Sequence, residues 1–373
     1  MNRLFAALAM GGLLLGTAPG RAQNKDKEKE KPAEKPAVDQ SKINKEGVSF
    51  KTCDGVLLKG TFYPSDKGGS SPAILMLPNL GSKRTDGDWE GLALRLQKKG
   101  YACLIFDWRG HGDSTQIVEP KVFWNYPYNQ TYLKTYDPNK KNLSIKDFKV
   151  GYIPYLLNDI AAARYDLDNR NDNGQCNTSN IILIGAESGA SLGFAWIMAE
   201  FYRPQIYKQG NLFQFGGAPV NQDPAGDDIA GAIWLSYRRH PGFTAASSTS
   251  IDVPYGFWLS WPGLTAVRDN VQMWFAQGSK DDKKGPADAQ YMYKTILNAE
   301  KKKDKLPLTS MLPIEGTALR GVALLGKKEL PTEDRIEQFI DKAVKMRPNQ
   351  AQKKRNASEF KPILIDPAGL GYR

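Results

Sequence analysis

The chain has 373 residues and a formal net charge of +11 at pH 7, from 51 Lys and Arg against 40 Asp and Glu. Its basic residues are spread along the sequence except at Lys353, Lys354 and Arg355, and no aromatic stacking motif accompanies them. This pattern indicates weak attraction to anionic surfaces and argues against nucleic acid as a partner.

Cysteine and histidine are scarce, with three Cys and two His in the whole chain. Cys53, Cys103 and Cys176 allow one disulfide at most, and the sequence leaves its pairing open. Cys103 lies in an apolar run and is expected to be a small core residue. Because no Cys/His cluster has the spacing of metal ligands, the sequence predicts neither a metal site nor a cofactor.

The N-terminus has the layout of a cleavable signal peptide over residues 1–22. Its apolar run, residues 4–16, is too short to span a bilayer, and the small residues that follow suit a signal peptidase. A retained anchor is the alternative, although no further apolar stretch follows, so no membrane span is expected in the mature chain. Residues 23–46 alternate Lys with Asp or Glu, which predicts a disordered linker. The protein is therefore expected to be secreted or periplasmic.

The predicted elements then alternate along the chain. A hairpin is expected over 48–51 and 56–63 around the Asp54-Gly55 turn. Apolar runs predict buried strands at 72–77, 101–106 and 181–184, and amphipathic or apolar stretches predict helices at 88–99, 153–168 and 188–202. Further strands are expected at 232–235, 271–276 and 309–314, and helices at 286–299 and 332–346. This order predicts one α/β domain over 47–346, with a mainly parallel sheet covered by helices on both faces, followed by a basic tail over 347–373.

Residues 107–114 read D-W-R-G-H-G-D-S and follow a predicted strand. This loop resembles the D-x-R-G-x-G-x-S loop of the α/β-hydrolase superfamily, and the resemblance to its esterase, lipase and serine-aminopeptidase-like members extends over about 47–346. The loop is structural in that family. His111 is therefore expected to be a turn and packing residue and not a catalytic base.

The segment 181–193 reads I-I-L-I-G-A-E-S-G-A-S-L-G. In the family a buried strand ends in G-x-S-x-G, and a strained strand-to-helix turn carries the nucleophilic serine. Aligning the strand end with this pattern places Glu187 at the nucleophile position, between Gly185 and Gly189. Two other registers would place Ser188 or Ser191 there, but both extend the strand beyond its apolar residues.

The family's catalytic acid and base follow later in the chain. Residues 278–282 read G-S-K-D-D and resemble the turn that carries the acid, which favours Asp281, with Asp282 as second choice and turn capping as the alternative role. The segment 315–322 reads E-G-T-A-L-R-G-V and places Arg320 where the family has His. A guanidinium cannot accept a proton near neutral pH, so the resemblance implies a site without a general base.

These departures together predict an ion network of Glu187, Arg320 and Asp281 in place of Ser-His-Asp, in a protein without catalytic activity that binds a ligand or has a structural role. Backbone N–H groups at Leu80 and Ser188 would keep an oxyanion hole. The alternative is an active serine hydrolase that uses Ser188 or Ser191, with His240 as an out-of-order base.

Residues 115–151 form an aromatic-rich insert at the expected mouth of the site. Trp124, Tyr126 and Tyr128 are candidates for contact with a small molecule, a glycan or a peptide. The other interpretation is that these rings pin a long loop onto the core.

Overall fold

A computed structural model describes residues 44–208, 225–240, 242–244, 250–252, 263–281, 284–347 and 350–367. The predicted signal peptide, almost all of the predicted linker and Asp282 lie outside these ranges. Among the described helices none is long and apolar enough to cross a membrane.

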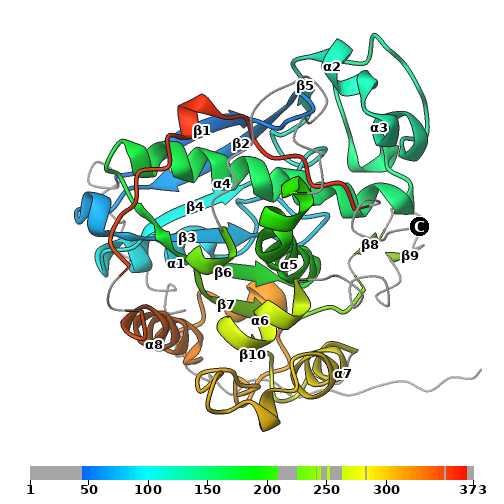
Figure 1. The fold of residues 1–373 in the computed structure, drawn as a ribbon. Helices are drawn as coiled ribbons and strands as arrows, with labels where there is room; N and C mark the ends of the chain where they lie inside the picture. The colour runs from blue at the N-terminus through cyan, green and yellow to red at the C-terminus, as the bar shows by residue number, and fades with distance from the viewer. Residues whose placement is uncertain are drawn as a thin grey trace, which may run out of the picture. The chain divides into compact units, whose positions relative to one another are not determined.

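An eight-stranded sheet forms the centre of the molecule (Figure 1). Seven strands follow the spatial order β1-β2-β4-β3-β6-β7-β10, and β5 pairs with β2 off this path. β1 and β2 form an antiparallel hairpin, β2 is antiparallel to β4, and the pairs from β4 through β3, β6 and β7 to β10 are parallel. The strands are β1 (Glu46–Lys51), β2 (Val56–Tyr63), β3 (Pro72–Leu77), β4 (Ala102–Phe106), β5 (Gln116–Ile117), β6 (Asn177–Ala186), β7 (Ile229–Leu235) and β10 (Gln272–Ala276).

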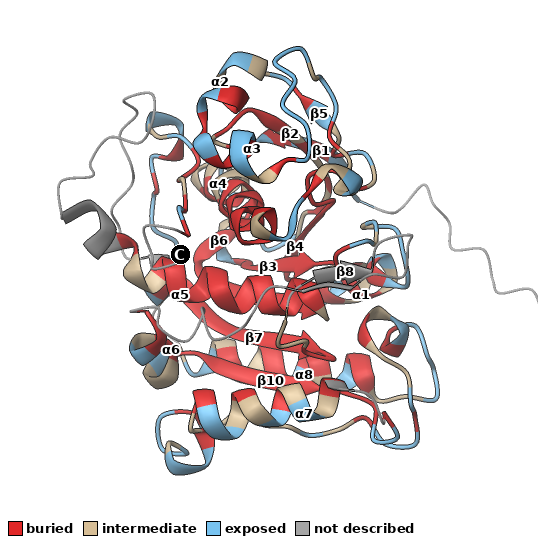
Figure 2. Cartoon of the chain, turned by 90° about the vertical axis from the view of Figure 1, so that its right-hand side faces the viewer, coloured by how far each residue is buried: buried red, intermediate tan, exposed pale blue. Residues whose placement is uncertain are grey.

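Helices cover both faces of this sheet. Successive side chains of a strand point to opposite faces, and apolar side chains on both faces of this sheet are buried under helices. Leu75 and Leu77 of β3 belong to the core on one side, while Ile74 and Met76 belong to the core on the other. The first core includes residues of α4 (Leu157–Asp172), α5 (Ser188–Lys208), α6 (Leu264–Asn270) and α7 (Lys284–Tyr291). The second includes residues of α1 (Trp89–Lys98) and α8 (Thr332–Lys345). Figure 2 shows the central strands and α5 as mostly buried.

This architecture confirms the predicted fold class, a mainly parallel α/β sheet with an N-terminal hairpin. The predicted strand at 309–314 is wrong, because this segment makes only isolated bridges at Ser310 and Ile314. Met273 N–H donates to the Thr309 hydroxyl, 3.0 Å away, and Pro313 has no N–H to donate, so a regular ladder does not form.

Two predicted helices have different bounds. The first is preceded by a 3₁₀ segment (Val150–Leu156) that contains Pro154, and α4 then continues to Asp172. The second divides into α7 and a π-helical stretch (Met292–Ile296), after which Asn298 has a left-handed backbone. A small two-stranded sheet, β8 (Gly242–Thr244) with β9 (Ser250–Asp252), was not predicted.

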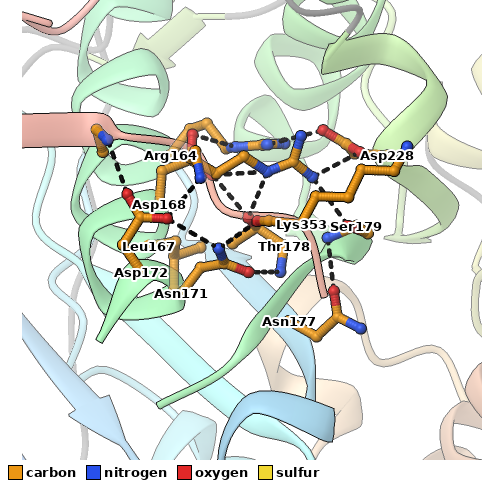
Figure 3. Close-up of polar contacts among 12 residues, drawn as sticks. Arg164, Leu167, Asp168, Asn171, Asp172, Asn177, Thr178, Ser179, Asp228 and Lys353 are labelled. Atoms are coloured by element: carbon orange, nitrogen blue, oxygen red, sulfur yellow. Dashed lines mark hydrogen bonds and ion pairs between the residues drawn. The ribbon is translucent and has the colours of Figure 1, made fainter. Parts of the chain in front are cut away.

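The described residues of the C-terminal segment, 350–367, pack against the domain. Asp228 holds two guanidinium groups, those of Arg164 and Arg355, each at 2.8 Å. Arg355 also donates to the Ser179 hydroxyl at 3.0 Å, and the Asn171 amide donates to the Lys353 carbonyl at 2.8 Å. Figure 3 shows this cluster between α4, the start of β6 and the C-terminal segment. Buried charges stay ionised at low cost only when they are paired, so this cluster fixes the segment to the domain.

Candidate functional site

The turn between β6 and α5 is strained at the residue that was expected at the nucleophile position. Glu187 lies there with a φ of 48°, a left-handed value that non-glycine residues rarely adopt. Its N–H donates to Leu235 O at 2.9 Å, and its carbonyl accepts from Ala190 N at 3.1 Å. The strained residue of the strand-to-helix turn is therefore a glutamate.

The glycines on either side of Glu187 allow close contact between neighbouring backbones. A Cβ at Gly189 would lie 2.3 Å from Pro78 O, and a Cβ at Gly185 would lie 2.7 Å from Ala190 Cα. Neither position has room for a larger residue. The N-terminus of α5 thus packs directly against the loop that follows β3.

Arg320 reaches this turn on a loop that is held by the Ser236 side chain. Gly321 N–H donates to the Ser236 hydroxyl at 2.9 Å, and Ser236 N–H donates to Ala276 O at 2.7 Å. Ser236 follows β7 and also has a positive φ, 54°. The two adjacent strands β6 and β7 therefore both end in a non-glycine residue with left-handed backbone, on either side of the Arg320 loop.

Asp281 lies on the turn after β10. Lys280 N–H donates to Thr317 O at 2.9 Å, and Ser279 N–H donates to Ile314 O at 2.8 Å. These bonds tie the Asp281 turn to the segment that leads to Arg320. The Asp281 side chain is only 1% exposed.

The three side chains meet at the carboxyl ends of the strands. Arg320 Nε lies 3.7 Å from Glu187 Oε1 and 3.5 Å from Asp281 Oδ2. Both separations exceed those of good N–H···O hydrogen bonds, about 2.7 to 3.2 Å, so these contacts are ionic. Glu187 and Arg320 are 28% and 21% exposed, which leaves the outer side of the group open to solvent.

The two serines considered as alternative nucleophiles lie within α5 and are buried. Ser188 is fully buried and Ser191 is 1% exposed. The Ser191 hydroxyl donates to Arg238 O and lies 3.4 Å from Glu187 O. A buried hydroxyl committed to a backbone carbonyl is poorly placed to attack a substrate.

The loop after β3 differs from the expected oxyanion hole. Ser188 N–H, the donor that follows the strained turn, donates to Asn79 Oδ1 at 3.1 Å. Leu80, the second expected donor, is 3% exposed. The acceptor of the Ser188 N–H group is thus a side chain of the protein itself.

The D-W-R-G-H-G-D-S segment braces this loop. Trp108 Nε1 donates to Pro78 O at 2.8 Å, and Gly81 N–H donates to His111 Nε2 at 2.9 Å. His111 Nδ1 lies 2.9 Å from Arg109 O, so Nδ1 carries the proton and Nε2 accepts. Burial lowers the pKa of His111, which keeps the ring neutral.

Arg109 of the same segment anchors the insert. Its guanidinium lies 2.7 Å from Asp54 Oδ2 and 2.6 Å from Asp159 Oδ1, and all three side chains are fully buried. Asp54 also accepts from the Tyr128 hydroxyl at 2.9 Å and from Asn129. Burial would raise the pKa of Asp54, but the charge and hydrogen bonds of Arg109 lower it.

The aromatic rings of the insert are mostly buried. Trp124, Tyr126 and Tyr128 are 4%, 3% and 7% exposed, and Tyr128 stacks on Tyr155 with ring centroids 4.2 Å apart. This packing corresponds to the interpretation in which the rings pin the insert to the core.

Apart from the Glu187 group, the described part of the chain has no metal site but does have a polar cavity. No group of three or more His, Cys, Asp or Glu there is arranged to hold a metal ion, and the three cysteines are free. A polar cavity of about 540 Å³ lies at the other end of the strands, near the starts of β7 and β10. Asp228, Gln272 and Arg355 form part of its wall. Ligands of parallel α/β sheets bind at the carboxyl ends of the strands, so the Glu187 group is the better candidate.

The strand order and the strained strand-to-helix turn after β6 are those of the α/β-hydrolase fold, and the chain has this fold. No family model matches the chain. It is similar to an esterase of Pyrococcus furiosus, with 16% identity and a TM-score of 0.47 over 80% of this chain and 91% of that one. It is also similar to a dienelactone hydrolase of Anabaena variabilis, with 12% identity and a TM-score of 0.43 over 81% and 98%.

Similarity to curated sequences is confined to short stretches. An uncharacterized protein of Mycobacterium tuberculosis is 38% identical over 66 residues, which is 17% of this chain and 22% of that protein. A polyketide transferase of a Penicillium species is 34% identical over 74 residues, or 20% and 24% of the two chains. The chain thus matches about a quarter or less of the length of these relatives, and their activities are not transferred to it.

Two residues of the site were missed by sequence reasoning. Ser236 holds the Arg320 loop, and nothing in the sequence near β7 indicates its positive φ. Asn79 directly precedes Leu80 in the sequence, and a side chain with an acceptor oxygen beside the expected donor was a usable indication.

Proposed function

We propose that this protein is an exported, catalytically inactive relative of the α/β hydrolases, in which an ion network of Glu187, Arg320 and Asp281 replaces Ser-His-Asp. The observation that carries the proposal is the position of Glu187 on the strained turn after β6, with the Arg320 guanidinium 3.7 Å from its carboxylate.

The chemistry of these residues supports inactivity. A guanidinium such as that of Arg320 is too weak a base to take a proton from a nucleophile. A carboxylate at the turn can serve as nucleophile in other members of this superfamily, but hydrolysis of its covalent intermediate then still needs a base. The fold alone does not decide whether the protein is an enzyme, since the same scaffold carries many activities.

The proposed role is the binding of a small molecule, a glycan or a peptide at the carboxyl ends of the strands. Three observations support it: the position at the strand ends, the partial exposure of Glu187 and Arg320, and a cluster of charges of both signs. Export by a signal peptide in residues 1–22 would place this activity in the periplasm or outside the cell.

Hydrolysis of short-chain p-nitrophenyl esters by the purified protein tests inactivity. We expect rates equal to those of Glu187→Gln, Ser188→Ala and Ser191→Ala variants and of a no-protein control. Turnover that Ser188→Ala or Ser191→Ala abolishes would identify an active serine hydrolase instead.

Ligand binding is tested separately by thermal unfolding in the presence of glycan fragments and short peptides. A ligand that binds only the native state raises the melting temperature, with a stabilisation that grows as the logarithm of its concentration over Kd. The stabilisation is expected to disappear in Glu187→Ala and to persist in Lys327→Ala, which changes an exposed residue beyond the Arg320 loop. If neither class of compound raises the melting temperature, the structural role remains and the binding proposal is rejected.

A further inference from the structure

The N-terminus of α5 presents the backbone donor that acyl-transfer enzymes of this fold aim at a developing oxyanion. In this chain that donor is Ser188 N–H, directly after the strained Glu187. It lies 3.1 Å from Asn79 Oδ1, within hydrogen-bond distance. An amide oxygen of the protein therefore occupies the position at which an oxyanion would be bound.

The loop that carries Asn79 is held in place from several sides. Trp108 Nε1 binds Pro78 O at 2.8 Å, immediately before Asn79, and His111 Nε2 accepts from Gly81 N–H at 2.9 Å, two residues after it. Ser82 N–H donates to Asn79 O at 3.1 Å and closes the turn. Gly189 of α5 lies against Pro78 O, so the helix and the loop are in direct contact. Withdrawal of the Asn79 side chain would leave Ser188 N–H without this acceptor.

The charge at the turn explains why a neutral acceptor suits this position. The Glu187 carboxylate lies one residue before Ser188, and a second negative charge at the same donor would be repelled by it. The Asn79 amide satisfies the donor without adding charge. A carboxylate or phosphate from a ligand would have to displace this amide and also approach Glu187.

We propose that the Asn79 side chain is an internal occupant of the oxyanion hole, which excludes carboxylate, phosphate and tetrahedral oxyanions from Ser188 N–H. The proposal rests on the proposed function in that it takes Glu187 as the residue at the nucleophile position. It adds that the loss of catalysis has a second, independent cause besides the changed triad. Replacing Glu187 and Arg320 alone would then not restore reactivity.

The test compares full-length variants in their reaction with a fluorophosphonate, whose adduct places an oxygen in the oxyanion hole. A double variant, Glu187→Ser with Arg320→His, restores the family's nucleophile and base. A triple variant adds Asn79→Gly, and a matched triple adds Asn139→Gly at an exposed Asn of the insert. Circular dichroism and melting temperature verify that each variant is folded.

We expect the Asn79→Gly triple variant to be labelled about 100-fold faster than the other two, because loss of one oxyanion donor costs about 10² to 10³ in rate. Equal rates in all three, including no labelling of any, would overturn the proposal. Labelling of the wild-type protein at Ser188 or Ser191 would contradict the proposed function instead, so the two failures are distinguishable.

Hydrogen exchange of the Ser188 amide gives a second measurement in the otherwise unchanged chain. Exchange is expected to accelerate at least tenfold in Asn79→Ala and to stay slow in Asn139→Ala, which changes an exposed Asn of the insert. Unchanged exchange in Asn79→Ala would show that Asn79 does not hold this donor and would overturn the proposal without reference to any reaction.

Discussion

Arg320 is the residue on which the charge balance at the strained turn depends. It is the cation between Glu187 and the nearly inaccessible Asp281 carboxylate. Removing a guanidinium from a partly buried pair leaves the buried partner without compensation, which costs more than the loss of an exposed ion pair. The long Nε distances and the partial exposure of Arg320 reduce this cost.

We therefore expect Arg320→Ala to lower the free energy of unfolding by about 1 to 3 kcal/mol, between the values for exposed and buried pairs. Urea unfolding at pH 7 measures it. Arg320→Lys should recover part of the loss because it keeps the charge, and Lys328→Ala, at an exposed position, should have no effect. An unchanged midpoint for Arg320→Ala would mean that the three charges do not act as a unit.

His111 gives the loop after β3 a dependence on pH. Its buried ring must stay neutral to accept from Gly81 N–H, and burial lowers its pKa below the ordinary value. Below a pH of about 6.5 the unfolded chain therefore binds a proton at this His that the native state does not bind. Stability contributed by the neutral ring is present above that pH and is lost as the pH falls.

The measurement compares wild type with His111→Gln, which keeps an acceptor and cannot titrate. Between pH 7 and pH 5 the wild type should lose more stability than the variant, with a slope of up to about 1.4 kcal/mol per pH unit. Parallel pH profiles would show that His111 is not held neutral in the native state. Wild type and His111→Gln are compared because Asp159, whose pKa burial raises to about 6, changes stability in the opposite direction over the same range in both proteins.

At the scale of elements, the C-terminal segment behaves as a structural strap across α4. Figure 1 shows it in red along that helix, and its residues Ile363 and Ile365 add to the core on that face. Arg355 is its main polar attachment, with a side chain only 4% exposed and paired to Asp228. The attachment of the strap to the domain therefore depends more on the buried charge of Arg355 than on the adjacent basic residues.

Arg355→Ala should lower the free energy of unfolding by about 3 kcal/mol or more, because it leaves part of the Asp228 charge uncompensated. It should also make the chain after residue 350 sensitive to limited proteolysis. Lys354→Ala, one residue earlier and exposed, is the matched control and should resemble wild type in both assays. Equal protease sensitivity of the two variants would argue against Arg355 as the attachment.

For the molecule as a whole, the sequence was informative where structure is decided locally. Apolar runs such as 72–77 and 101–106 become central strands because both of their faces are buried, and Gly185 and Gly189 locate the turn because no larger residue fits there. The strand predicted at 309–314 does not form, because Met273 N–H donates to the Thr309 hydroxyl and Pro313 has no N–H to add to a ladder.

The contacts that define the site depend on tertiary structure, and the sequence predicted them only through the family resemblance. Glu187, Asp281 and Arg320 come from three loops more than 30 residues apart in the chain, and only the sheet brings them together. The bond from Ser188 N–H to Asn79 spans 109 residues and involves a side chain whose direction no local pattern specifies. The attachment of the strap by Arg355 is likewise non-local, so the basic tail was recognised only by its charge.

The proposed inactivity requires that the turn after β6 carries a carboxylate and that no serine of the protein is a nucleophile. The most direct test is the intact mass of the wild-type protein after incubation with a fluorophosphonate, with peptide mapping of any adduct. We predict an unchanged mass under conditions that fully label a known serine esterase. A stoichiometric adduct on Ser188 or Ser191 would contradict the account and identify the protein as an active serine hydrolase.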